Sequence, residues 1–92
     1  MWTRLDDRMP DHPKIRACDL SARWLFIKGL CYAGAFLTDG FLRTNEALAL
    51  AGELKRPKAA IQQLVAAGLW QPVEGGYAVH DFLVYTHHAR RF

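Results

Sequence analysis

The segment from Trp24 to Leu37 is apolar on nearly every face, and it constrains the fold more than any other part of this chain of 92 residues. Only Lys28, Gly29 and Gly34 interrupt it. A helix that is apolar all round is surrounded by other elements, and this run is too short to span a bilayer. We therefore expect a central core helix with the rest of the chain packed around it.

Capping signals mark where the first helices begin. Ser21 is a favoured N-cap residue for the core helix, and Leu20 and Leu25 have the spacing of a hydrophobic staple. A short helix is expected before it, because Pro13 suits a first helical turn and follows an Asp-His pair that can cap it. Residues 2–5 alternate weakly and indicate a short edge strand.

Composition places the chain among folded single-domain proteins, since 51% of its residues are hydrophobic and 23% are charged. The formal net charge of +3 suits an anionic partner without requiring one. Cys18 and Cys31 form no CxxC pair and are expected to be buried thiols in a reducing compartment. The N-terminus has no apolar region typical of a signal peptide. We expect a soluble, cytoplasmic protein without membrane association.

Shorter elements are expected after the core helix. Residues 41–43 are typical of a very short strand, and Thr44 is placed to cap a second amphipathic helix that Gly52 can end. A third helix is predicted over 56–67. The β-rich runs around the glycine pair at 75–76 indicate a hairpin, since paired glycines supply the positive φ angles of a tight turn.

This order of elements is the arrangement of a winged helix-turn-helix, in which a helix pair joined by a short turn is followed by a two-stranded wing. The predicted fold class is therefore mainly α with a small β-hairpin (α+β). One domain is expected over residues 1–84, followed by a short basic tail over 85–92.

The helix over 56–67 is predicted to have two faces. At about 100° per residue, a core face centred on Ile61 also holds Pro57, Leu64, Val65 and Gly68. The opposite face holds Arg56, Ala59, Gln63 and Ala66, with Lys55 and Gln62 at its margin. Lys58 is expected nearer the core edge, with its stem on apolar surface and its ammonium in water.

Three cations stand at the beginning of this helix, where the partial positive charge of a helix N-terminus makes each unfavourable by about 0.3–1 kcal/mol. They are Lys55, Arg56 and Lys58. A local rule broken without structural gain indicates function, and a phosphate would satisfy both the cations and the free N–H groups. The competing explanation is solvated surface, where such cations and exposed glutamines are common.

The same face suits double-stranded DNA. Glutamines bond to adenine edges, small residues let the backbone approach, and cations reach phosphates. The expected nucleic-acid-binding residues are Lys55, Arg56, Lys58, Ala59, Gln62, Gln63 and Arg43. A homodimer would compensate for the weak binding of one small module, although no dimer face can be identified from the sequence.

A protein partner is the alternative to DNA. The presumed wing tip carries Glu74 and no basic residue, so it is not built to bind phosphates. Together with the aromatic residues Tyr85 and Phe92 of the tail, it would suit a host or phage protein of the replication or transcription machinery.

Nothing in the sequence indicates an enzyme, a cofactor or a metal site. The His80-Asp81 and His87-His88 pairs have no recognised ligand spacing, and Cys31 lacks the base and the electropositive setting that a nucleophile needs. The aromatic residues of the core helix are expected to be packing residues. They are Trp24, Phe26, Tyr32 and Phe36.

Several short motifs together resemble a known family. "MWTRLDD", "DHPKI", "LCYAGAFLTDGF", "LVAAGLW" and "VEGGYAVHDFLVY" are similar, in order and spacing, to motifs of small winged-helix domains from actinobacterial phages and prophages. Those domains stand at the N-termini of replication-initiator-like or helicase-loader-like proteins. The resemblance implies a winged-helix fold and a DNA-linked role, such as origin or regulatory-site binding, without catalytic residues. By position in the motif it makes Lys55 to Gln63 the recognition helix.

Overall fold

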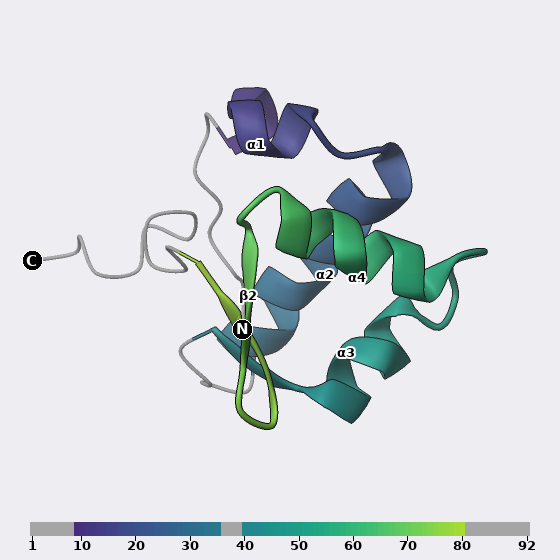
Figure 1. The fold of residues 1–92 in the computed structure, drawn as a ribbon, viewed down its shortest axis with the longest axis vertical. Coiled ribbons are helices and arrows are strands. Elements are labelled where there is room, and N and C mark those ends of the chain that lie inside the picture. The colour runs from purple at the N-terminus through teal and green to yellow at the C-terminus, as the bar shows by residue number, and fades with distance from the viewer. Residues whose placement is uncertain (1–8, 36–39, 81–92) are drawn as a thin grey trace, which may run out of the picture.

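Helix α2 (Leu20–Ala35) is the central element of the fold, as its apolar sequence predicts, and α3, α4 and strand β1 all pack against it. The computed structural model describes residues 9–35 and 40–80 (Figure 1). The expected edge strand at 2–5, the tail at 85–92, and Phe36, Tyr85, His87, His88 and Phe92 lie outside the described residues.

The helix is less uniformly buried than the sequence predicts. Leu25, Phe26 and Leu30 are fully buried, but Trp24 is 49% exposed and Leu20 is 76% exposed. Because about half of the Trp24 surface is in solvent, its predicted role as a core packing residue is wrong. The apolar character of α2 therefore continues onto one part of its solvent-facing side.

The N-terminus of α2 is capped by Asp19 and not by Ser21, because the helix begins at Leu20. The backbone N–H of Ala22 donates to Asp19 Oδ1 at 2.9 Å, which satisfies one of the free donors of the first turn. The predicted staple between Leu20 and Leu25 is also wrong, since Leu20 lies in solvent while Leu25 is buried.

A short 3₁₀ turn, η1 (Met9–Asp11), and helix α1 (Pro13–Arg16) precede α2. The ring of His12 caps α1, since its Nδ1 accepts a hydrogen bond from the backbone N–H of Lys14 at 3.1 Å. The predicted helix start at a proline after an Asp-His pair is thus confirmed.

Strand β1 (Phe41–Arg43) leads directly into α3 (Thr44–Ala51), and a turn over 52–56 leads into α4 (Pro57–Ala66). These elements confirm the predicted strand and helices. The cap position of α3 is Arg43 and not Thr44, because the backbone N–H of Arg43 already donates to Glu46 Oε1 at 3.0 Å.

Strands β2 (Trp70–Val73) and β3 (Gly76–Val79) form the predicted hairpin and join β1 in an antiparallel sheet of order β1-β3-β2. Tyr77 in the central strand pairs with Leu42 on one side and Pro72 on the other. The described residues therefore form a mixed α+β fold of four α-helices and a small sheet. No helix in this part of the chain is long and apolar enough to cross a membrane.

The two glycines of the hairpin serve different purposes, which corrects the prediction that both supply positive φ. Gly75 alone adopts a left-handed conformation, with φ of 83°. Gly76 is required because β1 approaches closely: a Cβ there would overlap the carbonyl oxygen of Leu42 and lie 2.8 Å from Cα of Arg43. Both requirements come from the way β1 joins the hairpin.

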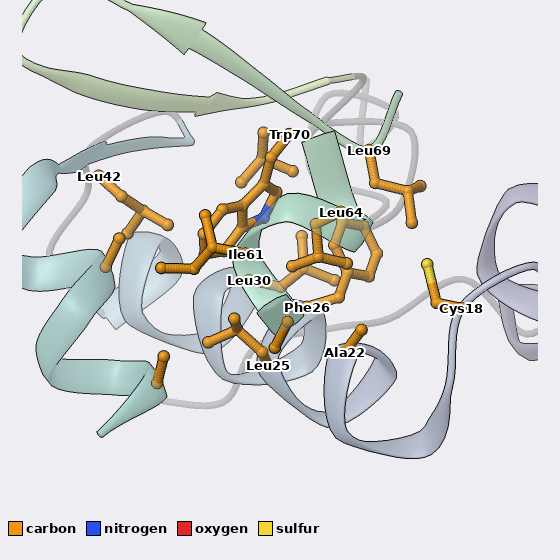
Figure 2. Close-up of a cluster of buried hydrophobic side chains, with 14 of the residues drawn as sticks. Cys18, Ala22, Leu25, Phe26, Leu30, Leu42, Ile61, Leu64, Leu69 and Trp70 are labelled. Atoms are coloured by element: carbon orange, nitrogen blue, oxygen red, sulfur yellow. The ribbon is translucent and has the colours of Figure 1, made fainter. Parts of the chain in front are cut away.

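The hydrophobic core lies between α2, α4 and the sheet (Figure 2). Its fully buried large side chains are Leu25, Phe26, Leu30, Leu42, Leu64, Leu69 and Trp70. Trp70 packs against the backbone of Gly29, where a Cβ would lie 2.9 Å from the indole Cζ2. The indole N–H of Trp70 is buried and has no hydrogen-bond acceptor in the described structure. Helix α2 and the sheet thus meet at a contact that leaves no room for a side chain on Gly29.

The two cysteines have different environments. Cys18 is buried, and its burial raises the pKa of its thiol. Cys31 is exposed on α2, so the prediction that both thiols are buried is wrong for this residue. The apolar pattern of α2 does not show which of its positions, Cys31 among them, face solvent.

Candidate nucleic-acid interface

The solvent-facing side of α4 carries Lys58, Gln62 and Ala66, while Ala60, Ile61 and Leu64 are buried. The predicted core face was centred on Ile61, and the buried face is instead turned toward Ala60. Lys58 is exposed and lines a groove together with Ile61, which is compatible with its predicted place at the core edge with the ammonium in water. Ala60 is buried on that side, and Gln62 lies between Lys58 and Ala66 on the outward face.

Gln63 does not belong to this outward face. Its Oε1 accepts a hydrogen bond from the backbone N–H of Asp19 at 2.9 Å, and its Nε2 donates to Asp19 Oδ2 at 2.8 Å. With both ends of the amide engaged, the expectation that Gln63 is exposed for a base edge is wrong. The bond from Gln63 Nε2 to the carboxylate is the largest cause of the lowered pKa of Asp19.

The cations at the start of α4 are exposed, as predicted. Lys55 and Arg56 lie in the turn before the helix, and Lys58 lies in its first turn, just after Pro57 at the first helical position. Among the described residues, no hydrogen bond or salt bridge is found for these three side chains. They form a cluster of unpaired positive charges at the N-terminal end of α4, where the partial positive charge of the helix makes cations unfavourable.

A shallow groove of about 260 Å³ lies beside Lys58, between α4, the beginning of α3 and strand β3. Its apolar lining comes from Ile61, from the ring of Tyr77 and from Leu48, which is 41% exposed. Its polar lining comes from Thr44, Lys58 and Gln62. The groove therefore brings Lys58 and Gln62 together with the first residue of α3.

The remaining predicted site residues, Arg43 and Ala59, do not line this groove. Arg43 is exposed and directly precedes Thr44, at the end of β1. Ala59 is half-buried on α4. The hairpin turn carries the exposed Glu74, and neither β2 nor β3 contains a lysine or an arginine. The cationic part of this surface therefore comes from α4 and the turn before it, with Arg43 at its edge.

The Glu46 carboxylate contributes to the local order beside Arg43. It accepts the backbone N–H of Arg43, which is the largest cause of its lowered pKa, and a hydrogen bond with Tyr32 lowers that pKa further. The same bond raises the pKa of Tyr32. This acid thus stabilises the start of α3.

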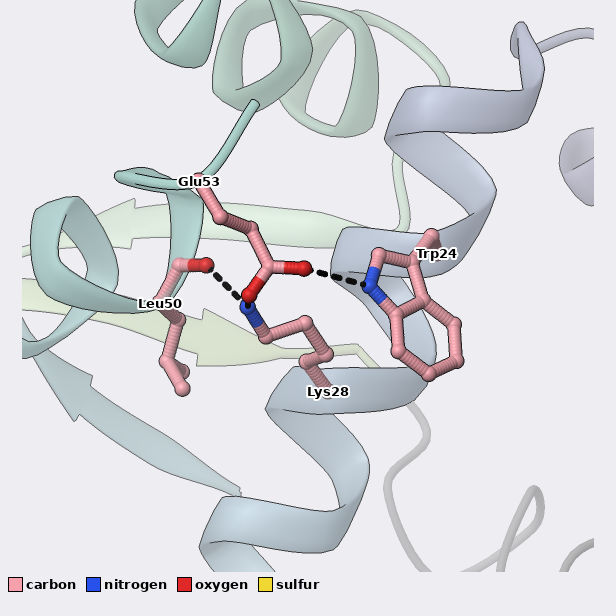
Figure 3. Close-up of polar contacts among 4 residues, drawn as sticks. All are labelled: Trp24, Lys28, Leu50 and Glu53. Carbon is pink, nitrogen blue, oxygen red and sulfur yellow. Dashed lines mark hydrogen bonds and ion pairs between the residues drawn. The ribbon is translucent and has the colours of Figure 1, made fainter.

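A second polar cluster joins α2 to the end of α3 (Figure 3). Lys28 Nζ donates to the carbonyl oxygen of Leu50 at 2.6 Å and forms a salt bridge with Glu53 Oε1 at 2.8 Å. Trp24 Nε1 donates to Glu53 Oε2 at 3.2 Å. The Lys28 bond is the largest cause of the lowered pKa of Glu53. Sequence reasoning missed this cluster, although Lys28 is the one charge within the apolar segment and a charge there needs a partner.

The described histidines lie apart from this surface. His12 caps α1, and the exposed His80 directly follows strand β3. Within residues 9–35 and 40–80, no three His, Cys, Asp or Glu side chains come close enough to hold a metal ion.

Comparisons with protein-family models, with curated proteins and with solved structures found no match for this chain.

Proposed function

We propose that this chain is a DNA-binding protein with a winged helix-turn-helix fold, of phage or mobile-element type, which acts in replication initiation or transcriptional regulation. The element order and the sheet order β1-β3-β2 support this fold. In it, α3, the turn and α4 form the helix-turn-helix, and the N-terminal part of α4 enters the major groove.

One observation carries the proposal. Lys55, Arg56 and Lys58 are all exposed at the start of α4, and no described residue pairs with their side chains. Phosphates bind cations placed in this way and also accept from the free N–H groups of a helix N-terminus. Since the local electrostatics of α4 disfavour these cations, an anionic partner offsets a cost that the free protein carries.

The neighbouring residues suit the same partner. Gln62 lies on the outward face one turn after Lys58 and is placed to hydrogen-bond a base edge. Ala59 and Ala66 have short side chains, so that α4 can approach the major groove of the DNA closely. Arg43, just before α3, would contact a DNA phosphate. Gln63 has no part in base reading in this proposal, because its amide binds Asp19.

The test is the binding of a random-sequence DNA duplex, followed by fluorescence anisotropy between about 50 and 200 mM salt. We expect the affinity to fall with salt. The slope should become shallower by about 0.9 for each phosphate that the variants Lys55→Ala, Arg56→Ala and Lys58→Ala no longer neutralise. Arg16→Ala is the matched control, because it removes the same charge from an exposed position on α1. Absence of binding at low salt, or equal effects of Arg16→Ala and Lys58→Ala, overturns the proposal.

The alternative function is a protein-interaction module of the same fold. Two observations favour it: Glu74 at the tip of the hairpin is acidic, and the groove beside Lys58 has an apolar lining that includes the exposed Leu48. An acidic protein surface would then bind the cations. Failure to bind DNA together with copurification of a stoichiometric protein from the native host supports this alternative.

A further inference from the structure

The turn that carries the cations is attached to the core helix by one carboxylate. Glu53 lies in the turn over 52–56, shortly before Lys55. Its Oε1 binds Lys28 Nζ at 2.8 Å and its Oε2 accepts from Trp24 Nε1 at 3.2 Å (Figure 3). Both donors belong to α2 and lie one helical turn apart, so the two carboxylate oxygens bind the same helix.

The same lysine also holds the end of α3. Lys28 Nζ donates to the carbonyl oxygen of Leu50 at 2.6 Å, and this carbonyl lies in the last turn of α3, where helices leave acceptors unsatisfied. The Lys28 side chain is only 18% exposed, whereas that of Glu53 is 62% exposed. A largely buried cation therefore links α2 to the end of α3 and to the turn that follows.

The salt bridge with Lys28 also determines how the charge of Glu53 affects Lys55 and Arg56. An unpaired carboxylate this close in sequence to Lys55 and Arg56 would repel a phosphate bound there. Its charge is instead neutralised by Lys28, and Lys55 and Arg56 keep no partner among the described residues. The cluster thus separates the acid from the cations that follow it.

We propose that Glu53 is a positioning residue for the DNA contact: by binding Trp24 and Lys28, its carboxylate holds the turn over 52–56 so that Lys55 and Arg56 face the phosphates. This inference rests on the proposed function. It assigns to an acidic residue a role that strengthens the binding of a polyanion, which is opposite in sign to the effect of its charge alone.

That opposition in sign makes the test sharp. Glu53→Gln removes one negative charge, as does the control Glu74→Gln in the hairpin turn, where Glu74 is exposed. Charge alone predicts that both variants bind duplex DNA more tightly. We expect Glu53→Gln to bind several-fold more weakly than the wild-type protein, with a salt slope shallower by about 0.9, the contribution of one neutralised phosphate. Glu74→Gln should bind as tightly as the wild type or more tightly.

A charge-neutral variant gives a second test. Trp24→Phe keeps an aromatic ring and removes the N–H that binds Glu53, together with part of the indole surface, and we expect weaker binding with the net charge unchanged. All variants are compared well below their melting temperatures, so that a loss of folded protein does not enter the affinities. The inference is overturned if Glu53→Gln binds as tightly as Glu74→Gln, or if Trp24→Phe binds like the wild type.

Amide hydrogen exchange separates failure of this inference from failure of the proposed function. We expect the amides of residues 52–56 to exchange faster in Glu53→Gln and Trp24→Phe than in Glu74→Gln, with or without DNA. Unchanged exchange overturns the positioning role even if the wild-type protein binds DNA. If these variants exchange faster but the wild-type protein binds no DNA, the DNA contact is refuted, while the conclusion that Glu53 attaches residues 52–56 to α2 is supported.

Discussion

Asp19 and Gln63 exchange two hydrogen bonds, of 2.9 and 2.8 Å, and so join the N-terminal cap of α2 to α4. Asp19 also caps α2 through the N–H of Ala22. One glutamine of the adjacent pair in α4 is thus a structural residue, whereas its neighbour Gln62 faces solvent. The two glutamines can therefore be separated experimentally.

Replacing each glutamine in turn should give opposite results. Gln63→Ala removes two hydrogen bonds from a half-buried side chain and should lower the free energy of unfolding by about 1–2 kcal/mol. Gln62→Ala should change the stability by less than about 0.5 kcal/mol but weaken the binding of duplex DNA. Urea denaturation and anisotropy measure the two effects. A loss of stability in Gln62→Ala, or a loss of affinity only in Gln63→Ala, contradicts this division.

Stability should fall in acid. The pKa values of Asp19, Glu46 and Glu53 are lowered from 3.8, 4.5 and 4.5 by the hydrogen bonds of the folded state. Because a lowered pKa means that the unfolded chain binds protons first, this stabilisation is complete above those ordinary values and is lost as pH falls through the folded pKa values. Urea denaturation across this range measures the loss. The loss should be smaller in Asp19→Asn, and a stability that stays constant below pH 3.8 contradicts the assignment.

Gly29→Ala should destabilise the protein although alanine favours helices. The added Cβ would lie 2.9 Å from Cζ2 of the buried Trp70, so that the indole would have to shift. Overpacking costs about 1–3 kcal/mol, which exceeds the gain in helix propensity of about 1 kcal/mol. The control is Ser21→Ala on the exposed side of α2, which should be neutral or slightly stabilising. Thermal unfolding of both variants checks this, and equal melting temperatures would show that the indole can move.

The two glycines of the hairpin should differ in cost. Gly75→Ala places a side chain in open space at φ of 83°, and the left-handed conformation should cost about 1–2 kcal/mol. Gly76→Ala should cost more, because its Cβ would overlap the backbone of Leu42 in the neighbouring strand. Amide exchange of Leu42 and Arg43 should rise only in Gly76→Ala. If the amides of Leu42 and Arg43 exchange no faster in Gly76→Ala, the close approach of β1 to Gly76 is contradicted.

Local patterns were sufficient for most elements of the fold. Pro13 and the Asp-His pair marked the start of α1, Gly52 the end of α3, and the glycine pair at 75–76 the hairpin. These signals act within a few residues, so a sequence displays them directly. The winged helix-turn-helix topology stays a prediction, supported by the order of these elements.

Contacts between distant residues were not predictable in the same way. Asp19 and Gln63 are 44 positions apart, and Lys28 and Glu53 are 25 apart, so nothing in the local pattern pairs them. Helical periodicity located the apolar side of α4 only approximately, because the pattern does not show that a small residue such as Ala60 is buried. The cations at the start of α4 were found because they oppose a local rule, and a local rule can be read from sequence.

The central claim, that the start of α4 binds DNA phosphates, is tested most directly by mapping a short duplex onto the backbone amides by NMR at low salt. We expect the largest shift changes at Lys55, Arg56, Lys58 and Gln62, and little change at α1. These changes should disappear in about 0.5 M salt, where exposed charges are screened. Shift changes confined to other surfaces, such as the exposed side of α2 around Leu20, or no changes at low salt, would contradict the claim.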